Sequence, residues 1–227
     1  MLTKFKKLTT YTSLLQYQTE VLTAIRKSIN KNRKTYIALS GGTTPLPIYK
    51  ALSRETNIDF SQIEFYQVDE RYIPRNNANS NYKMIYRSLI KPLNLKNQFH
   101  YFHTNLLIEK SLTEYENLLQ KIPNQQFDLI ILGIGPDGHT ASLFPFDPTL
   151  DEDTKLTAHT QSTQFAIKNR LTITFPLIMK AKKILLLAAG PEKELIIEKI
   201  HDPKTDFHQI PAKKLMEHEN VEIMYLK

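Results

Sequence analysis

Asp137 and His139 are the side chains in this sequence whose types and spacing best suit chemistry. They follow an apolar run that begins at Phe127, and three glycines stand before and between them. A histidine can act as a general base because its ordinary pKa lies near neutrality, and a nearby carboxylate can orient it. A lone histidine would more simply be a buried structural residue bonded to a backbone carbonyl. The glycines and the preceding apolar run favour a catalytic role here.

A second segment that could bind a ligand is 40–45, with the sequence SGGTTP. Gly41 and Gly42 allow the backbone to approach a ligand closely, and Thr43 adds a hydroxyl. If a helix begins after this segment, its first N–H groups have no internal partners and can bind an anion. The glycine spacing matches neither of the common nucleotide-binding loops. Taken alone, the segment is equally a tight turn capped by threonines.

Charged residues at three further places could complete a binding site. Asp69 and Arg71 follow one apolar run, Arg170 precedes another, and Lys193 follows a third. Carboxylates at strand ends can accept hydrogen bonds from sugar hydroxyls, and arginines can hold phosphate with two parallel hydrogen bonds. Taken singly, each residue is more simply a solvated surface charge. The other six histidines show no spacing with acids that suits a metal ion, so we expect no metal site.

Alternating strands and helices must position these residues. Their order predicts an α/β protein in three layers, with a mainly parallel, twisted sheet and helices on both of its faces. Ligands of such proteins collect at the carboxyl ends of the strands. No repeat or linker interrupts the pattern, so we expect a single domain over 1–227. The expected strands are 35–39, 63–68, 99–102, 128–134, 171–175, 182–189 and 221–226, and the expected helices are 13–31, 46–52, 80–90, 108–122, 191–200 and 211–217.

Composition limits the classes of function. The chain has 227 residues, of which 41% are hydrophobic and 23% charged, as in a globular protein with a well-buried core. It has no cysteine, which excludes disulfides and thiolate metal sites. The N-terminal residues lack the apolar run of a secretory signal, and no segment is long and apolar enough to span a bilayer. We therefore expect a cytoplasmic protein without a membrane partner.

The formal net charge of +7 has three possible explanations. A nucleic-acid-binding protein often gathers its basic residues on one face, but here they are scattered along the sequence and not clustered with aromatic residues. A generally basic proteome is the favoured explanation, and we expect no nucleic-acid partner. A positive field would also help a small anionic substrate to reach the protein.

Together these segments resemble the 6-phosphogluconolactonase family and, more distantly, the glucosamine-6-phosphate deaminases. The resemblance runs from about Ile37 to the C-terminus. It implies a Rossmann-like fold of the deaminase and lactonase type and the hydrolysis of 6-phospho-D-glucono-1,5-lactone to 6-phosphogluconate, in the oxidative pentose phosphate pathway. No cofactor is expected, because lactone hydrolysis transfers neither hydride nor electrons. The matching pieces are, in order, ALSGGTTPLPIYKAL, VDERYIP with SNY, LGIGPDGHTASLFP, RLTITFP, AAGPEK and the dipeptide PA at 211–212.

The resemblance and the chemistry of ester hydrolysis together assign roles to these residues. An ester carbonyl needs a positioned water, a base for its proton and positive charge or N–H donors for the oxyanion. His139 would be the base, and Asp137 would support it. Asp69 would contact sugar hydroxyls or support the loop. All the other predicted site residues would bind the sugar phosphate lactone, through its phosphate, its hydroxyls or its developing charge, so that the predicted binding residues are Gly41, Gly42, Thr43, Asp69, Arg71, Arg170 and Lys193.

Phe144 separates the two activities that the resemblance implies. The deaminases carry a glutamate five residues after the histidine, as part of a proton relay, and this sequence has Phe144 there. A phenyl ring cannot carry a proton, so lactone hydrolysis is favoured over the deaminase and isomerase reaction. A non-enzymatic sugar-phosphate-binding module is the other alternative, and Asp137 and His139 argue for catalysis. We expect a monomer or a weak homo-oligomer.

Overall fold

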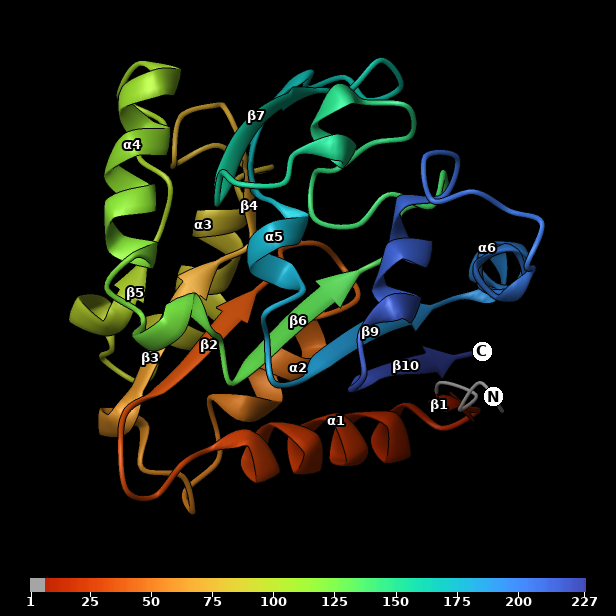
Figure 1. Cartoon of the computed structure of the whole chain (residues 1–227). Coiled ribbons are helices and arrows are strands. Elements are labelled where there is room, and N and C mark those ends of the chain that lie inside the picture. The colour runs from red at the N-terminus through yellow and green to blue at the C-terminus, as the bar shows by residue number, and fades with distance from the viewer. Residues whose placement is uncertain (1–6) are drawn as a thin grey trace.

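A parallel sheet of seven strands forms the centre of the protein in the computed structural model, which describes residues 7–227 (Figure 1). Residues 1–6, part of the N-terminal segment predicted not to be a secretory signal, lie outside the described residues. Within residues 7–227, no helix has both the length and the apolar character needed to cross a membrane. Across the sheet the strands are β1 (Lys7–Tyr11), β10 (Val221–Leu226), β9 (Ile184–Ala189), β6 (Leu129–Gly133), β2 (Thr35–Leu39), β3 (Ile63–Gln67) and β5 (Phe99–His100).

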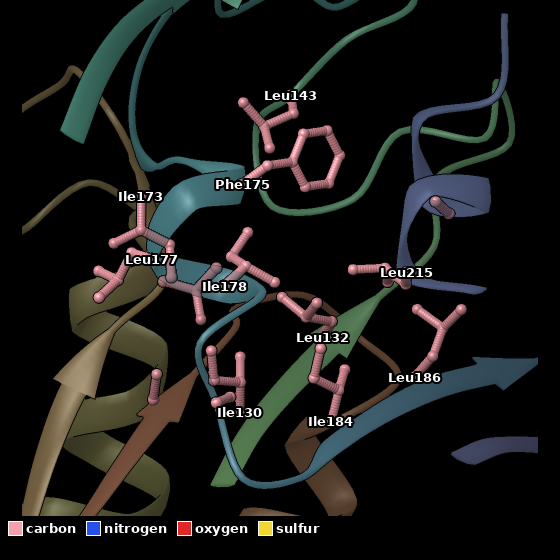
Figure 2. Close-up of a cluster of buried hydrophobic side chains, with 14 of the residues drawn as sticks. Ile130, Leu132, Leu143, Ile173, Phe175, Leu177, Ile178, Ile184, Leu186 and Leu215 are labelled. Atoms are coloured by element: carbon pink, nitrogen blue, oxygen red, sulfur yellow. The ribbon is translucent and has the colours of Figure 1, made fainter. Parts of the chain in front are cut away.

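Helices cover both faces of this sheet because the side chains of each central strand alternate between two apolar clusters. In β6, Leu129 and Ile131 face one cluster, and Ile130 and Leu132 face the other. Figure 2 shows Ile130 and Leu132 beneath α5, on the second face. The three-layer α/β prediction is therefore confirmed. The first face packs against α1 (Leu14–Ser28), α2 (Leu46–Leu52) and α3 (Asn81–Ile85), and the second against α4 (Ile108–Leu119), α5 (Phe175–Ile178) and α6 (Glu194–His201).

Two helix starts follow directly from local sequence. Ser13 caps α1 as predicted, with its hydroxyl accepting a hydrogen bond from the backbone N–H of Gln16 at 3.4 Å. Ser80 caps α3 in the same way through the N–H of Lys83. The expected helix 80–90 is α3 followed by a π-helical segment, Tyr86–Ile90.

A small antiparallel sheet stands above the second face, and the sequence did not predict it. It consists of β4 (Asp69–Arg71), β8 (Asn169–Ile173) and β7 (Thr157–Gln161), in that order. We expected Asp69–Arg71 to be only the polar end of the preceding strand, but it pairs with β8. The expected strand 171–175 instead ends at Ile173, because Phe175 begins α5 with a proline in its first turn. The edge strand β1 and the strand β7 were also missed.

The order of the central strands fixes where a ligand can bind. The chain passes from β2 outward to β3 and β5, and later from β6 outward in the other direction to β9 and β10. The neighbours β2 and β6 therefore flank the point where the direction of winding changes. Ligands of open α/β sheets bind in the crevice beyond the carboxyl ends of the strands at such a point. The segments 40–45 and 134–145 leave these two strands there.

Candidate active site

A cavity of about 250 Å³ lies beyond the carboxyl ends of β2 and β6, and segments from both sheets line it. Ser40 to Pro45 come from the turn after β2, and Gly133 to Pro136 come from the end of β6 and its turn. The small sheet contributes Asp69 and Arg170, so it closes one side of the cavity. Of the predicted site residues, those that line the cavity are Gly41, Gly42, Thr43, Asp69, Arg71, His139, Arg170 and Lys193.

Asp137 lies behind His139 and does not itself line the cavity. Its Oδ1 is 2.5 Å from Nδ1 of His139 and also accepts the backbone N–H of that residue. Burial acts to raise the pKa of Asp137, but the hydrogen bonds and charge of His139 outweigh it, so the pKa lies below its ordinary value. An ionised carboxylate only accepts hydrogen bonds, so it favours the tautomer of a neutral imidazole that carries its proton on Nδ1, in which Nε2 is a proton acceptor.

A tight turn holds the Asp137–His139 pair in place. The backbone N–H of Gly135 donates to the carbonyl of His139, and the N–H of Gly138 donates to the carbonyl of Gly135. Gly138 has a φ of +84°, which favours glycine. Gly135 is needed for another reason: a Cβ there would lie 2.1 Å from Nδ1 of His139.

Two phenyl rings pack against His139. Phe144 and Phe165 have ring centroids 4.9 Å and 5.3 Å from the imidazole. The guanidinium of Arg170 lies over both phenyl rings, 6.0 Å and 5.8 Å from their centroids. The position that carries a glutamate in the deaminases is thus occupied by an apolar ring in contact with His139.

Arg71 and Arg170 are directly opposite one another in the small sheet. Neither forms an ion pair with a carboxylate among residues 7–227; Arg71 donates to the carbonyl of Asn79, and Arg170 donates to that of Ile167. Burial lowers the pKa of Arg170, and the charge of Arg71 lowers it further, against the opposing effect of nearby acids. Like charges opposite one another destabilise a sheet, so an anion between them would relieve this repulsion.

Asp69 uses its carboxylate within the protein. Oδ2 accepts a hydrogen bond from the hydroxyl of Ser142 at 2.5 Å, and Oδ1 accepts one from Nδ2 of Asn81 at 3.2 Å. The residue is 7% exposed. Of the two predicted roles, contact with sugar hydroxyls or support of the loop, this geometry favours support.

The remaining predicted residues border the cavity from two other loops. Gly42 has a φ of +102°, which turns the chain after β2 toward α2. Lys193 lies in a short 3₁₀ turn, Pro191–Lys193, after β9, and it forms no ion pair within the described part of the chain. No three His, Cys, Asp or Glu side chains among residues 7–227 gather where they could hold a metal ion.

Several residues that line the cavity were not predicted as site residues, and Asn81, Ser142 and Phe165 are among them. Asn81 lies in the SNY motif, which contributes to the family resemblance but whose residues were given no role in the predicted site. Ser142 lies within the central motif, two residues before Phe144, and could have been found there. Phe165 belongs to the connection between β7 and β8, where no sequence pattern marked it.

Known proteins of one family resemble the chain over most of its length. The family model described as glucosamine-6-phosphate isomerases/6-phosphogluconolactonase matches residues 12–224. A protein of Dictyostelium discoideum named probable 6-phosphogluconolactonase is 34% identical over 208 residues, which cover 88% of each chain. A protein of Synechocystis sp. named 6-phosphogluconolactonase is 36% identical over 202 residues, which cover 85% of this chain and 82% of the relative.

A solved structure shows the same likeness in three dimensions. The crystal structure of 6-phosphogluconolactonase from Thermotoga maritima matches with a TM-score of 0.85 and 29% identity, over 97% of this chain and 98% of that one. The family model, the relatives and the solved structure all indicate the family that the motifs around the cavity resemble. The chain therefore belongs to the family of glucosamine-6-phosphate isomerases and 6-phosphogluconolactonases.

Proposed function

We propose that this protein hydrolyses 6-phospho-D-glucono-1,5-lactone to 6-phosphogluconate, with His139 as the general base. The observation that carries the proposal is the pairing of His139 with Asp137 at a cavity that also holds two arginines, neither of which pairs with a carboxylate of residues 7–227. The relatives named 6-phosphogluconolactonase support the choice of substrate.

The imidazole performs two proton transfers in this proposal. Nε2 of His139 takes a proton from a water molecule as the water oxygen attacks the lactone carbonyl carbon. Asp137 stabilises the imidazolium that forms, because its carboxylate already accepts the Nδ1 proton. The tetrahedral intermediate then collapses, the bond from carbon to the ring oxygen breaks, and Nε2 returns its proton to that oxygen. The products are a carboxylic acid, which ionises in water, and a free hydroxyl.

Arg71 and Arg170 hold the phosphate group in this proposal. Paired guanidinium groups present several N–H donors with a geometry that matches phosphate oxygens. The phenyl rings beneath Arg170 fix its position, which reduces the entropy lost when the phosphate binds. Lys193 and the turn of Gly41 to Thr43 supply further donors on the cavity wall, for the phosphate or for the developing oxyanion.

Phe144 supports hydrolysis over the deaminase and isomerase reaction. Its ring contacts the imidazole at the position where the deaminases have a relay glutamate. Without that relay, the role left to His139 is to take a proton from the water that attacks the lactone carbonyl.

A lactonase assay with spontaneous hydrolysis subtracted tests the proposal. His139→Ala should lower kcat about a hundredfold or more, because general base catalysis contributes on that order. His103→Ala is the matched control, since His103 lies outside the cavity and pairs with Glu114. Turnover of His139→Ala equal to that of the native protein would rule out the assigned base. Ammonia release from glucosamine 6-phosphate at a comparable rate would favour the alternative reaction.

The cations are tested by the same assay. Arg71→Ala and Arg170→Ala should mainly raise KM if these side chains hold the phosphate, whereas Arg87→Ala, which removes an exposed cation outside the cavity, should leave KM unchanged. For Lys193→Ala, a rise in KM would indicate a phosphate contact, and a loss of kcat alone would indicate a contact with the lactone carbonyl.

We further propose that the protein acts in the cytoplasm without a cofactor or nucleic-acid partner, as a monomer or weak homo-oligomer. These remain expectations from the sequence. Light scattering measures the oligomeric state, and a titration with DNA at several salt concentrations measures nucleic-acid affinity.

A further inference from the structure

Buried polar atoms without partners gather at the active-site cavity. Ser40, Arg71 and Asn81 all line it, and each has a buried atom, Oγ, Nε and Oδ1 respectively, with no hydrogen-bond partner among the described residues. Buried polar groups normally find a partner, so orphaned atoms around one cavity indicate that a ligand supplies the partner. The three other such atoms in residues 7–227 belong to Tyr17, Thr104 and Ser111.

Asn81 presents its orphaned oxygen in a fixed orientation. Its Nδ2 donates to the backbone carbonyl of Asp69 at 2.9 Å and to Oδ1 of the same residue at 3.2 Å. The hydroxyl of Ser142 donates a hydrogen bond to the other carboxylate oxygen of Asp69. These bonds determine which end of the amide is the nitrogen, so Oδ1 is the free acceptor. Asn81 is 2% exposed, and bulk water therefore has little access to it.

Gly41 leaves room for this oxygen at the cavity wall. A Cβ at residue 41 would lie 2.0 Å from Oδ1 of Asn81, so any larger residue would displace the amide. The neighbouring Ser40 has a buried hydroxyl that can both donate and accept a hydrogen bond. An acceptor and a hydroxyl thus lie beside the same glycine turn.

We infer that Asn81 is a specificity-determining residue, which accepts a hydrogen bond from the hydroxyl on C2, C3 or C4 of the substrate, while Ser40 donates to the oxygen of the same hydroxyl. The inference rests on the proposed function for the identity of the ligand. An orphaned acceptor needs a ligand group with a proton to donate. In the phosphorylated lactone the ionised phosphate, the carbonyl oxygen and the ring oxygen only accept, so the hydroxyls alone fit Asn81.

This arrangement selects against lactones that lack the hydroxyl. A ligand without it leaves Oδ1 of Asn81 and the hydroxyl of Ser40 buried and unpaired, and that loss discriminates more strongly than a difference in shape. The phosphate contacts of Arg71 and Arg170 are common to all sugar phosphates. Asn81 therefore supplies selectivity that the arginines cannot.

Binding measurements with Asn81→Leu test the inference without turnover. The ligands are 6-phosphogluconate and its three counterparts that lack one hydroxyl at C2, C3 or C4, titrated by calorimetry. The native protein should bind one of the deoxy compounds about ten- to a hundredfold more weakly than the parent. Asn81→Leu should bind the parent more weakly by a similar factor and no longer discriminate against that deoxy compound. Equal affinity of the native protein for all four ligands, or discrimination retained in Asn81→Leu, would overturn the inference.

Two further variants separate recognition from folding. Ser40→Ala removes one hydroxyl and leaves Asn81 in place, and it should weaken binding of the parent severalfold while affecting the same deoxy compound little. Ser80→Ala is the control: it removes the cap of α3 and a bond to Glu70 but does not line the cavity. Its discrimination should equal that of the native protein, and a loss there would show that Asn81 acts only through the fold. A native protein that discriminates among these ligands but does not hydrolyse the lactone would overturn the proposed function and leave the role of Asn81 standing.

Discussion

The backbone of Gly135 lies against the imidazole of His139, so that a Cβ on residue 135 would be 2.1 Å from Nδ1 and 2.6 Å from Oδ1 of Asp137. The two neighbouring side chains, His139 and Asp137, cannot move aside without disturbing the hydrogen bond that joins them. The absence of a side chain at residue 135 is therefore a condition for the pair itself.

Gly135→Ala should consequently reduce activity by displacing the imidazole of His139. The added methyl group forces the imidazole away from Asp137, and a displacement of about 1 Å from the productive geometry can cost on the order of a hundredfold in rate. We expect at least a tenfold fall in kcat, measured in the lactonase assay beside a thermal melt. A variant that remains folded with unchanged kcat would show that the pair tolerates this displacement.

Asp137 makes stability depend on pH in the acid range. Because the folded pKa of this carboxyl is held below the ordinary value of 3.8, its contribution to stability is present above pH 3.8 and is lost as pH falls through the folded pKa. Asp137→Asn should lower the free energy of unfolding at pH 7 by about 1–3 kcal/mol, as for a hydrogen bond to a charged group. Urea unfolding of both proteins should show this difference shrinking at pH 3 and below. A difference independent of pH would contradict the assigned cause.

Glu70 is a buried residue of β4 that accepts hydrogen bonds from the start of α3. Its carboxylate accepts from the backbone N–H groups of Arg71, Asn81 and Tyr82, and from the side chains of Ser80 and Gln67. Glu70→Gln replaces one acceptor oxygen by a donor that faces N–H groups, which should cost about 1–3 kcal/mol of unfolding free energy.

A control for Glu70 is Glu194→Gln, which breaks an exposed ion pair with Lys227 and should change stability less. Denaturant unfolding measures both. Equal effects of the two substitutions would mean that the backbone donors at Glu70 find other partners.

His208 joins two surface loops in a manner that depends on pH. It lies between Asp206 on Nδ1 and Asp151 on Nε2, and hydrogen bonds to Asp151 and then Asp206 raise its pKa above 6.5. Its stabilising contribution is fully present below pH 6.5 and is lost as pH rises through the folded pKa. His208→Gln should therefore lower the melting temperature at pH 6 and have little effect at pH 9. A larger effect at pH 9 would contradict this sign.

Much of the central sheet could be predicted from local patterns. The strand bounds of β2 and β10 and the helix α2 agree with the expected ranges, because each buries a continuous apolar face that shows in the sequence. The segments 40–45 and 134–145 were expected at strand ends, and that is where they lie. Family motifs marked eight residues that line the cavity, although their roles stay predictions.

Tertiary structure decided which of these residues meet. The pairing of β4 with β8 brings Arg71 opposite Arg170, about a hundred positions away in sequence. A strand of three residues such as β4 is too short for its alternating pattern to be recognised in the sequence. The contact of Phe165 with His139 depends in the same way on the hairpin of β7 and β8. The sequence by itself determined most helices and central strands and the Asp137–His139 turn, since these depend on residues close in the chain. Strand order, cross-strand register and the orientation of the Asn81 amide depend on packing between distant segments, and only the fold could decide them.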